Sequence, residues 1–207
     1  MNGYSITRDK FLSSKEKNRL LRVCKREAKR DLSQDRTVWV TRYMLIHLAL
    51  NSGLRVSEIA ALKVRDLHLN GKENYLTVQH GKGKKKRNVY LDDEIVKHLH
   101  IYKETKKTVW GLPVTDEDPF FTGRGGNHYT TTALEISFKK AIGKADLSHY
   151  YSIHSSRHTY ATFLLAKTKN LRFVQKQLGH ASIAMTSLYA DVLPEMNQSL
   201  ANAILKK

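Results

Sequence analysis

Apolar residues recur at intervals of three and four along the first part of the chain, the spacing expected for one face of a helix. The first predicted helix covers about 13–30, and Ser13 and Glu16 have the spacing of a capping box at its start. The second covers about 37–52, with Asp35 as its expected N-cap. We therefore expect two consecutive amphipathic helices at the start of the fold.

The pattern changes after Gly53, a residue type that commonly ends helices. A short helix is predicted over 56–62, and apolar and polar residues then alternate. This alternation predicts three strands, over 64–69, 75–79 and 87–91. Asn70-Gly71 suits a tight reversed turn between the first two strands, so we expect a small antiparallel sheet.

Helical spacing returns in the remainder of the chain, where Asp92 and Asp93 are expected to cap the first of several helices. These helices are predicted over about 94–106, 130–143, 155–166, 171–178, 182–190 and 194–205. The predicted fold class is mainly α with a small antiparallel β-sheet (α+β), in a single domain over 1–207.

The charge of the chain indicates the class of partner. Lys and Arg number 36 against 19 Asp and Glu, which gives a formal net charge of +17 and a pI of about 9.9. A pI above about 9 favours a nucleic-acid partner, because a basic surface releases the counterions condensed on a polyanion. Charge alone also suits a ribosomal protein or a protein of the membrane surface.

Hydropathy and cysteine content exclude other classes of protein. The sequence has no apolar run long enough to cross a bilayer and no apolar signal segment at its N-terminus, so we expect a cytoplasmic location, or one wherever the cell keeps its DNA. Cys24 is the one cysteine, which excludes an internal disulfide and a zinc site built from cysteine pairs. We expect Cys24 to be a buried structural thiol.

Two of five candidate chemical sites lie in the first half of the chain. Arg55 follows Gly53 at the corner between two predicted helices, within the stretch 51–58. The stretch 81–87 places two glycines, four lysines and an arginine between two predicted strands, where such side chains reach phosphates or a DNA groove. A surface Arg–Glu pair and a solvated charged turn are the ordinary explanations of these two stretches.

The other three candidate sites lie in the last third. His154 and Arg157 are three residues apart, so a helix places them on one face. His180 follows Leu178-Gly179 just beyond a predicted helix, and Tyr189 comes nine positions later. Each also suits a purely structural role, since the chain has ten tyrosines. The zinc-protease motif and the phosphate-binding P-loop are both excluded by spacing.

In this order the five sites resemble the tyrosine recombinase (phage integrase-like) family, over about Phe11–Leu193. That family has an arginine in Gly-Leu-Arg-x-Ser-Glu, a lysine on a Gly-Lys-Gly hairpin, then His-x-x-Arg-His, Leu-Gly-His and a tyrosine nine residues further on. The resemblance implies the family's catalytic-domain fold. It also implies an enzyme that cleaves and rejoins DNA through a covalent 3′-phosphotyrosine and a Holliday junction, without metal, ATP or cofactor.

The resemblance gives each motif residue a role in phosphoryl transfer. Tyr189 is the expected nucleophile, and His154 is the candidate general base that takes its proton. Arg55 and Arg157 are expected to bind the non-bridging phosphate oxygens, with His180 as a further donor. Replacing either arginine with alanine is expected to leave the fold intact and to slow cleavage severely.

Further residues complete the expected site. Lys82 is the general acid that the resemblance implies for the leaving 5′-oxygen, and Lys84 remains the alternative on spacing alone. Glu58 is expected to orient Arg55, and His158 to support the site from beside Arg157. The residues expected to contact DNA are Lys84, Lys85, Lys86 and Arg87.

The chain departs from the family pattern at two places. Ser156 stands where a leucine is common, and we expect this to affect packing more than chemistry. The family's separate N-terminal helical domain, which completes a clamp around DNA, is expected to be absent, and 194–207 to form a C-terminal helical tail. The expected partner is double-stranded DNA, with assembly into a tetramer on DNA and a monomer off it.

Three other functions use parts of the same pattern. A type IB topoisomerase has similar chemistry without exchange of partners, but the Gly-Leu-Arg-Val-Ser-Glu and Leu-Gly-His stretches favour a recombinase. A DNA-binding regulator could keep the fold and lose catalysis, which the complete residue set argues against. A plain basic nucleic-acid-binding module would make Tyr189 no more important than Tyr129.

Overall fold

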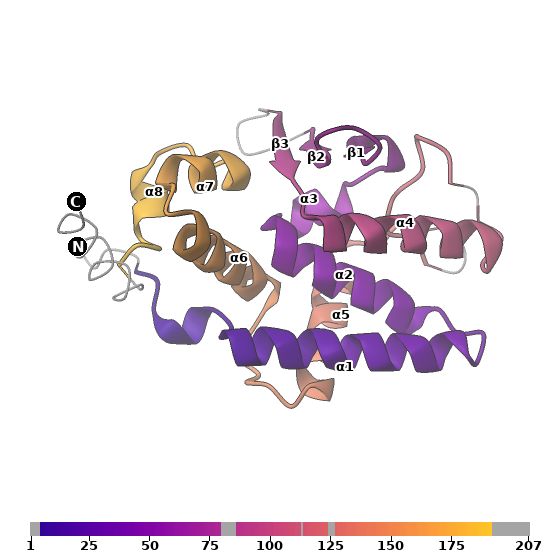
Figure 1. Cartoon of the computed structure of the whole chain (residues 1–207). Coiled ribbons are helices and arrows are strands. Elements are labelled where there is room, and N and C mark those ends of the chain that lie inside the picture. The colour runs from indigo at the N-terminus through magenta and orange to yellow at the C-terminus, as the bar shows by residue number, and fades with distance from the viewer. Residues whose placement is uncertain (1–4, 80–85, 113, 124–126, 192–207) are drawn as a thin grey trace.

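Helices and one small sheet make up the described part of the chain, as the computed structural model shows (Figure 1). The structure describes residues 5–79, 86–112, 114–123 and 127–191. The observed class, mainly α with a three-stranded antiparallel sheet, confirms the predicted one.

The first two helices are α1 (Ser14–Leu32) and α2 (Val38–Ser52). The predicted capping box is present, because Ser13 Oγ accepts from the Glu16 N–H at 3.2 Å and Glu16 accepts from the Ser13 N–H at 2.7 Å. The predicted cap of α2 was wrong. Asp35 lies in the left-handed region (φ 53°), and Asp31 from the end of α1 instead accepts from the Trp39 N–H at 2.7 Å.

Gly53 ends α2 in the left-handed conformation, with φ 63°. Only glycine suits this position, because a Cβ there would lie 2.4 Å from Cδ1 of Tyr160. The chain therefore turns sharply and enters α3 (Val56–Ala60), which starts directly after Arg55. This turn fixes where Arg55 leaves the backbone.

The sheet contains β1 (Leu67–His68), β2 (Tyr75–Val78) and β3 (Arg87–Tyr90), in that order and antiparallel throughout. The predicted first strand is shorter, since Val64–Asp66 form a 3₁₀ turn and their backbone pairs with the segment 116–118. Leu67 pairs with Leu76, so six residues connect β1 and β2 and the predicted two-residue Asn70-Gly71 turn was wrong.

Five further helices follow the sheet, and four of them match the predicted ones within a few residues. Their bounds are α4 (Asp93–Thr108), α5 (Thr131–Lys144), α6 (Ile153–Thr168), α7 (Leu171–Leu178) and α8 (Ala184–Ser187). Asp92 caps α4 and Thr130 caps α5 through their side chains. The predicted helix over 182–190 is only the single turn α8. The helix predicted over 194–205 lies outside the described residues.

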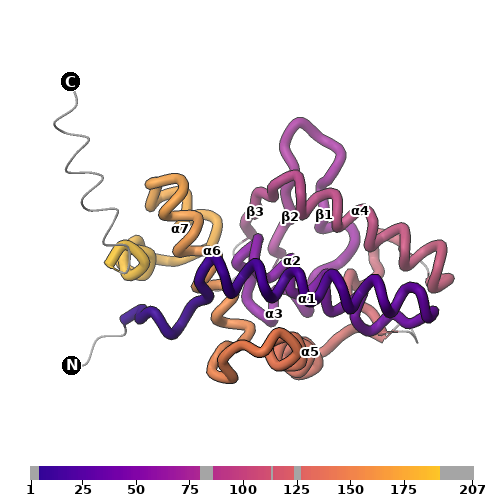
Figure 2. Tube along the Cα trace, turned by 60° about the horizontal axis from the view of Figure 1, so that its bottom comes forward, coloured from indigo at the N-terminus to yellow at the C-terminus, as the bar shows by residue number. Residues whose placement is uncertain are grey.

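The helix α2 lies between α1 and α4 (Figure 1), and α5 and the sheet lie on opposite sides of α1 (Figure 2). The main hydrophobic core joins these elements through buried residues such as Leu20, Met44, Leu76, Leu99 and Phe138. Cys24 is buried within it, and burial raises the pKa of its thiol to about 12.

A second, smaller cluster joins the N-terminal segment to α6 and α7. Its members include Ile6, Phe11, Leu165, Val174 and the ring of Tyr189. Apolar packing therefore holds Tyr189 against α6, although Tyr189 itself lies in a turn after α8. Among the described residues, no helix is both long and apolar enough to cross a membrane.

A pair of histidines links α2 to α4 away from this cluster. Nδ1 of His47 lies 2.8 Å from Nδ1 of His98, and the Tyr43 ring packs against both imidazoles. Burial lowers the pKa of His47 to about 4 and that of His98 to about 3. Both side chains are therefore neutral at pH 7 in the folded protein.

This pair predicts a loss of stability in mild acid. Each folded pKa lies below the unfolded value of about 6.5, so the stabilisation is complete above that pH and is lost as pH falls toward 4. The free energy of unfolding of wild type should fall as the pH is lowered from 7.5 to 5.5. In His98→Phe that fall should be smaller by about 1 kcal/mol, because one of the two histidines is gone. Urea unfolding at both pH values measures this, with the exposed His149→Gln as control. Equal losses in wild type and His98→Phe would contradict it.

Candidate active site

One pocket of about 260 Å³ collects five of the six predicted catalytic residues, together with His158. The corner after α2, the helix α6 and the segment around α8 supply its polar lining, and the N-terminal segment adds an apolar wall. The lining residues are Ile6, Arg55, His154, Arg157, His158, His180, Met185, Leu188 and Tyr189. Lys82, Lys84 and Lys85 lie outside the described residues, and Lys86 is exposed.

Arg55 enters the pocket from the turn that Gly53 makes possible. Its Nη1 donates to Oε1 of Glu58 at 2.8 Å, and its backbone N–H donates to Oε2 of the same carboxylate at 2.8 Å. Glu58 therefore holds both the backbone and the side chain of Arg55, which is the contact that the sequence predicts for it.

Arg157 is the most buried cation of the pocket, with 7% of its surface exposed. Its Nη1 donates to the Gly53 carbonyl at 2.6 Å and its Nη2 to the Leu178 carbonyl at 2.8 Å. Burial, followed by the charge of Arg55, lowers the pKa of Arg157 to about 10, so it stays positive at neutral pH. Arg157 thus joins the ends of α2 and α7 while facing the pocket.

Tyr189 lies beside the imidazoles, only 2% exposed. Its Oη is 3.0 Å from Nδ1 of His158, and its ring stacks 6.3 Å from that of His180. Nδ1 of His180 is 2.9 Å from Oγ1 of Thr186. Burial, followed by the charge of Arg157, lowers the pKa of both His158 and His180 to about 4. The two imidazoles are therefore neutral at pH 7 and able to accept a proton.

His154 lies on the same face of α6 as Arg157, as the three-residue spacing predicts, and it is exposed in the pocket wall. His158, which sequence reasoning placed in a supporting role, is the histidine whose Nδ1 meets the hydroxyl of Tyr189. The two histidines are four residues apart and occupy successive turns of α6.

Arg87 does not lie where a surface contact to DNA is expected. Its side chain is 10% exposed, and it donates to both oxygens of Glu58 at 2.8 and 2.7 Å. Sequence reasoning missed this contact because 29 residues separate the two positions. It also missed the partners supplied by Thr186 and by the carbonyls of Gly53 and Leu178, since no sequence pattern identifies a backbone acceptor.

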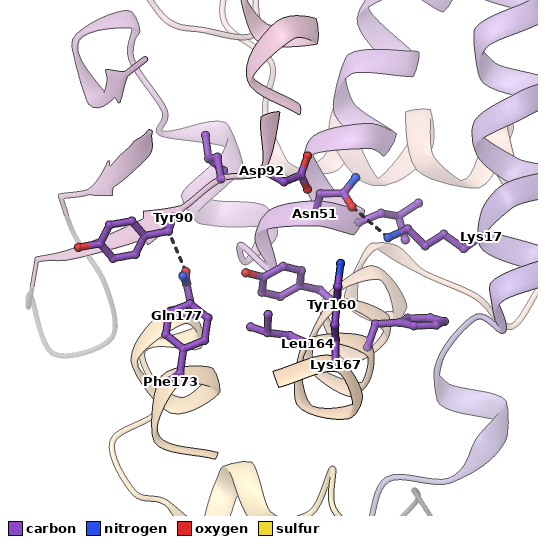
Figure 3. A pocket seen from close by; sticks show the side chains of 12 residues that line it. Lys17, Asn51, Tyr90, Asp92, Tyr160, Leu164, Lys167, Phe173 and Gln177 are labelled. Atoms are coloured by element: carbon purple, nitrogen blue, oxygen red, sulfur yellow. Dashed lines mark hydrogen bonds between the residues drawn. The ribbon is translucent and has the colours of Figure 1, made fainter. Parts of the chain in front are cut away.

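A larger hollow of about 380 Å³ lies between α1, α2, α6, α7 and the end of β3 (Figure 3). Its wall carries Lys17, Tyr90, Tyr160 and Gln177, and none of the predicted site residues lines it. The candidate active site is therefore the smaller pocket. Within the described ranges, no cluster of three or more His, Cys, Asp or Glu side chains could hold a metal ion.

Comparison with known proteins identifies the family of the chain. The profile of the Phage integrase family matches residues 10–196, close to the interval that the sequence motifs predict. The chain belongs to this family. Family membership confirms the resemblance to tyrosine recombinases that the motifs indicate.

Individual relatives support the same family. A tyrosine recombinase XerC from Lactobacillus leichmannii is 29% identical over 163 residues, which are 79% of this chain and 54% of that protein. The crystal structure of XerA recombinase has a TM-score of 0.76 at 26% identity and covers 99% of this chain and 67% of that chain.

The site-specific recombinase XerH, bound to palindromic difH substrate in a post-cleavage complex, has a TM-score of 0.74 at 25% identity. The matched region is 95% of this chain and 53% of the XerH chain. The chain spans about half the length of the curated relatives it matches.

The contacts of Arg157 predict a structural cost that its motif does not reveal. Arg157→Ala leaves the buried carbonyls of Gly53 and Leu178 without their donors, so the free energy of unfolding should fall by about 2–4 kcal/mol. Arg55→Ala should cost about 1 kcal/mol or less, because Arg87 still pairs with Glu58. Urea unfolding of both variants measures the difference. An equal loss in the two variants would contradict this assignment.

Proposed function

We propose that the chain is the catalytic domain of a site-specific DNA recombinase or integrase that cleaves and rejoins strands through a 3′-phosphotyrosine at Tyr189. The observation that carries the proposal is the pocket in which a buried tyrosine adjoins two guanidinium groups and three imidazoles. Two recombinases similar to this chain support the same conclusion: the tyrosine recombinase XerC, and XerH bound to its difH substrate.

The scissile phosphate occupies the pocket beside Tyr189 in this proposal. A phosphodiester carries one negative charge, and more charge develops on its non-bridging oxygens during attack. Arg55 and Arg157 both line the pocket with guanidinium donors, Arg157 stays positive at neutral pH, and His180 adds a neutral imidazole. Each preorganised donor of this kind contributes about 3–4 kcal/mol to stabilisation of the transition state.

Tyr189 attacks the phosphorus as a phenolate. A free phenol has a pKa of about 10, so its proton must be taken up during attack. His154 is the base that the motif predicts, and His158 is the base that the 3.0 Å contact with Tyr189 Oη favours. Comparison of the cleavage rates of His154→Ala and His158→Ala distinguishes the two bases.

The leaving group is the deoxyribose 5′-oxygen, which departs as the Tyr189 Oη–P bond forms and the P–O5′ bond breaks. Lys82, with Lys84 as the alternative, is the proposed donor of its proton. The phosphotyrosine keeps the energy of the broken phosphodiester. Attack by a 5′-hydroxyl then reverses the step, returns the proton and releases Tyr189 without ATP.

Double-stranded DNA is the proposed partner, and the net charge of +17 supports it. Exposed Lys86, with Lys84 and Lys85, is proposed to contact phosphates. Exchange between two duplexes requires four strand cuts. With one Tyr189 per chain, four copies supply them, so we propose a tetramer on DNA and a monomer off it. The proposed location is the cytoplasm, or wherever the cell keeps its DNA.

A plasmid assay tests the proposed chemistry. Wild type, incubated with supercoiled plasmid in EDTA without ATP, should form detergent-resistant protein–DNA adducts and relaxed topoisomers. Tyr189→Phe should bind DNA with wild-type affinity and form neither product, because it lacks the attacking oxygen. The exposed Tyr150→Phe is the matched control and should behave as wild type.

Adducts formed equally by Tyr189→Phe would contradict the assignment of the nucleophile. If wild type binds but gives no product, the assay is repeated with the N-terminal domain of a relative fused to the chain. Continued inactivity of that fusion on a relative's site would support a DNA-binding protein without catalysis. Two-site plasmids then separate recombination from relaxation alone.

A further inference from the structure

Arg87 begins β3, and its guanidinium is held by three acceptors inside the protein. Nη1 and Nη2 donate to the two oxygens of Glu58 at 2.8 and 2.7 Å, and Nε donates to the Gln177 carbonyl at 3.0 Å. A planar fork with its donors on three fixed acceptors has one orientation. The guanidinium of Arg87 is therefore held in a fixed position next to the site.

Glu58 is shared between this arginine and Arg55. Its Oε1 accepts from both guanidinium groups, while its Oε2 accepts from Arg87 and from the backbone of Arg55. Burial disfavours the charged carboxylate, yet Arg87 and then Arg55 hold its pKa at about 2. One negative charge is thus divided between two cations.

Arg87 also packs against the end of α7. Gln177 accepts a hydrogen bond from Arg87 through its backbone carbonyl. Its side-chain Oε1 accepts a second one from the Tyr90 N–H at 3.1 Å (Figure 3). Gly179 follows with φ 65°, and a Cβ there would lie 2.7 Å from Cδ of Arg87. The side chain of Arg87 therefore lies directly against the turn that leads into His180.

We infer that Arg87 is a positioning residue for the proposed strand cleavage. It neutralises most of the charge of Glu58, so that Arg55 stays available to the phosphate, and it fixes the turn from which His180 enters the pocket. The inference rests on the proposed function. Without Arg87, Glu58 would pair with Arg55 alone and draw that guanidinium away from the phosphate.

The test measures single-turnover adduct formation at saturating DNA. Arg87→Gln should lower the rate constant about 100-fold, the effect of misplacing a catalytic group by about 1 Å. Its Kd for DNA and the salt dependence of binding should equal those of wild type. Arg65→Gln is the matched control, because Arg65 is exposed and pairs with exposed Glu117, and its rate should not change.

Two further variants separate positioning from a structural role. Glu58→Gln combined with Arg87→Gln removes both buried charges and frees Arg55, so its rate should exceed that of Arg87→Gln by about 10-fold. A residue needed only for packing would give a double variant slower than the single one. Arg87→Lys keeps the charge without the fork and should be slower than wild type by about 10-fold. Circular dichroism and urea unfolding identify the folded variants.

The outcomes are distinct from those of the proposed function. A wild-type rate in Arg87→Gln overturns the inference and leaves the proposed function standing. The same holds if Arg87→Gln binds DNA with a raised Kd and the slope of log Kd against log salt concentration is reduced by about 1. That result would make Arg87 a DNA contact. If none of the three Arg87 variants folds, Arg87 serves the fold alone, which also overturns it. No adduct in wild type, and none in its fusion to a relative's N-terminal domain, overturns both proposals.

Discussion

The carboxylate of Glu58 is buried between Arg55 and Arg87, and the arrangement of the pocket depends on it. A buried carboxylate must be paired, and pairing it with two arginines from separate elements joins the corner after α2 to the sheet. Arg157 joins the same corner to the end of α7 through two carbonyls. Two guanidinium groups on one carboxylate, and a third on two carbonyls, thus unite distant parts of the chain at one place.

Burial and this positive charge together set the protonation of the pocket. Burial, followed by the charge of Arg157, keeps His158 and His180 neutral at pH 7, with pKa values of about 4. An anionic phosphate in the pocket would offset that charge and make it easier for an imidazole to accept a proton. This arrangement supports the proposed binding of an anion and the proposed uptake of a proton from Tyr189. Both depend on the burial of the pocket and on its arginines.

Local spacing predicted the sheet and most of the described helices. The resemblance carried by the motif order implied that Arg55, His154, Arg157, His180 and Tyr189 share one site, and all five line one pocket. The cap of α2 was wrong because Asp31 reaches it from the preceding helix. The inward position of Arg87 could not be predicted, since its partner lies 29 residues away and a lysine-rich neighbourhood favours a surface interpretation. Long-range pairing of charges leaves no periodic signal.

The most direct test of the account is the identity of the tyrosine that carries DNA. The adduct is trapped on a duplex nicked just beyond the cleaved phosphate, so that the released strand diffuses away, and is then digested and mapped by mass spectrometry. The account predicts a nucleotide linked through its 3′-phosphate to the peptide that contains Tyr189. Linkage to another tyrosine, or through a 5′-phosphate, would contradict it.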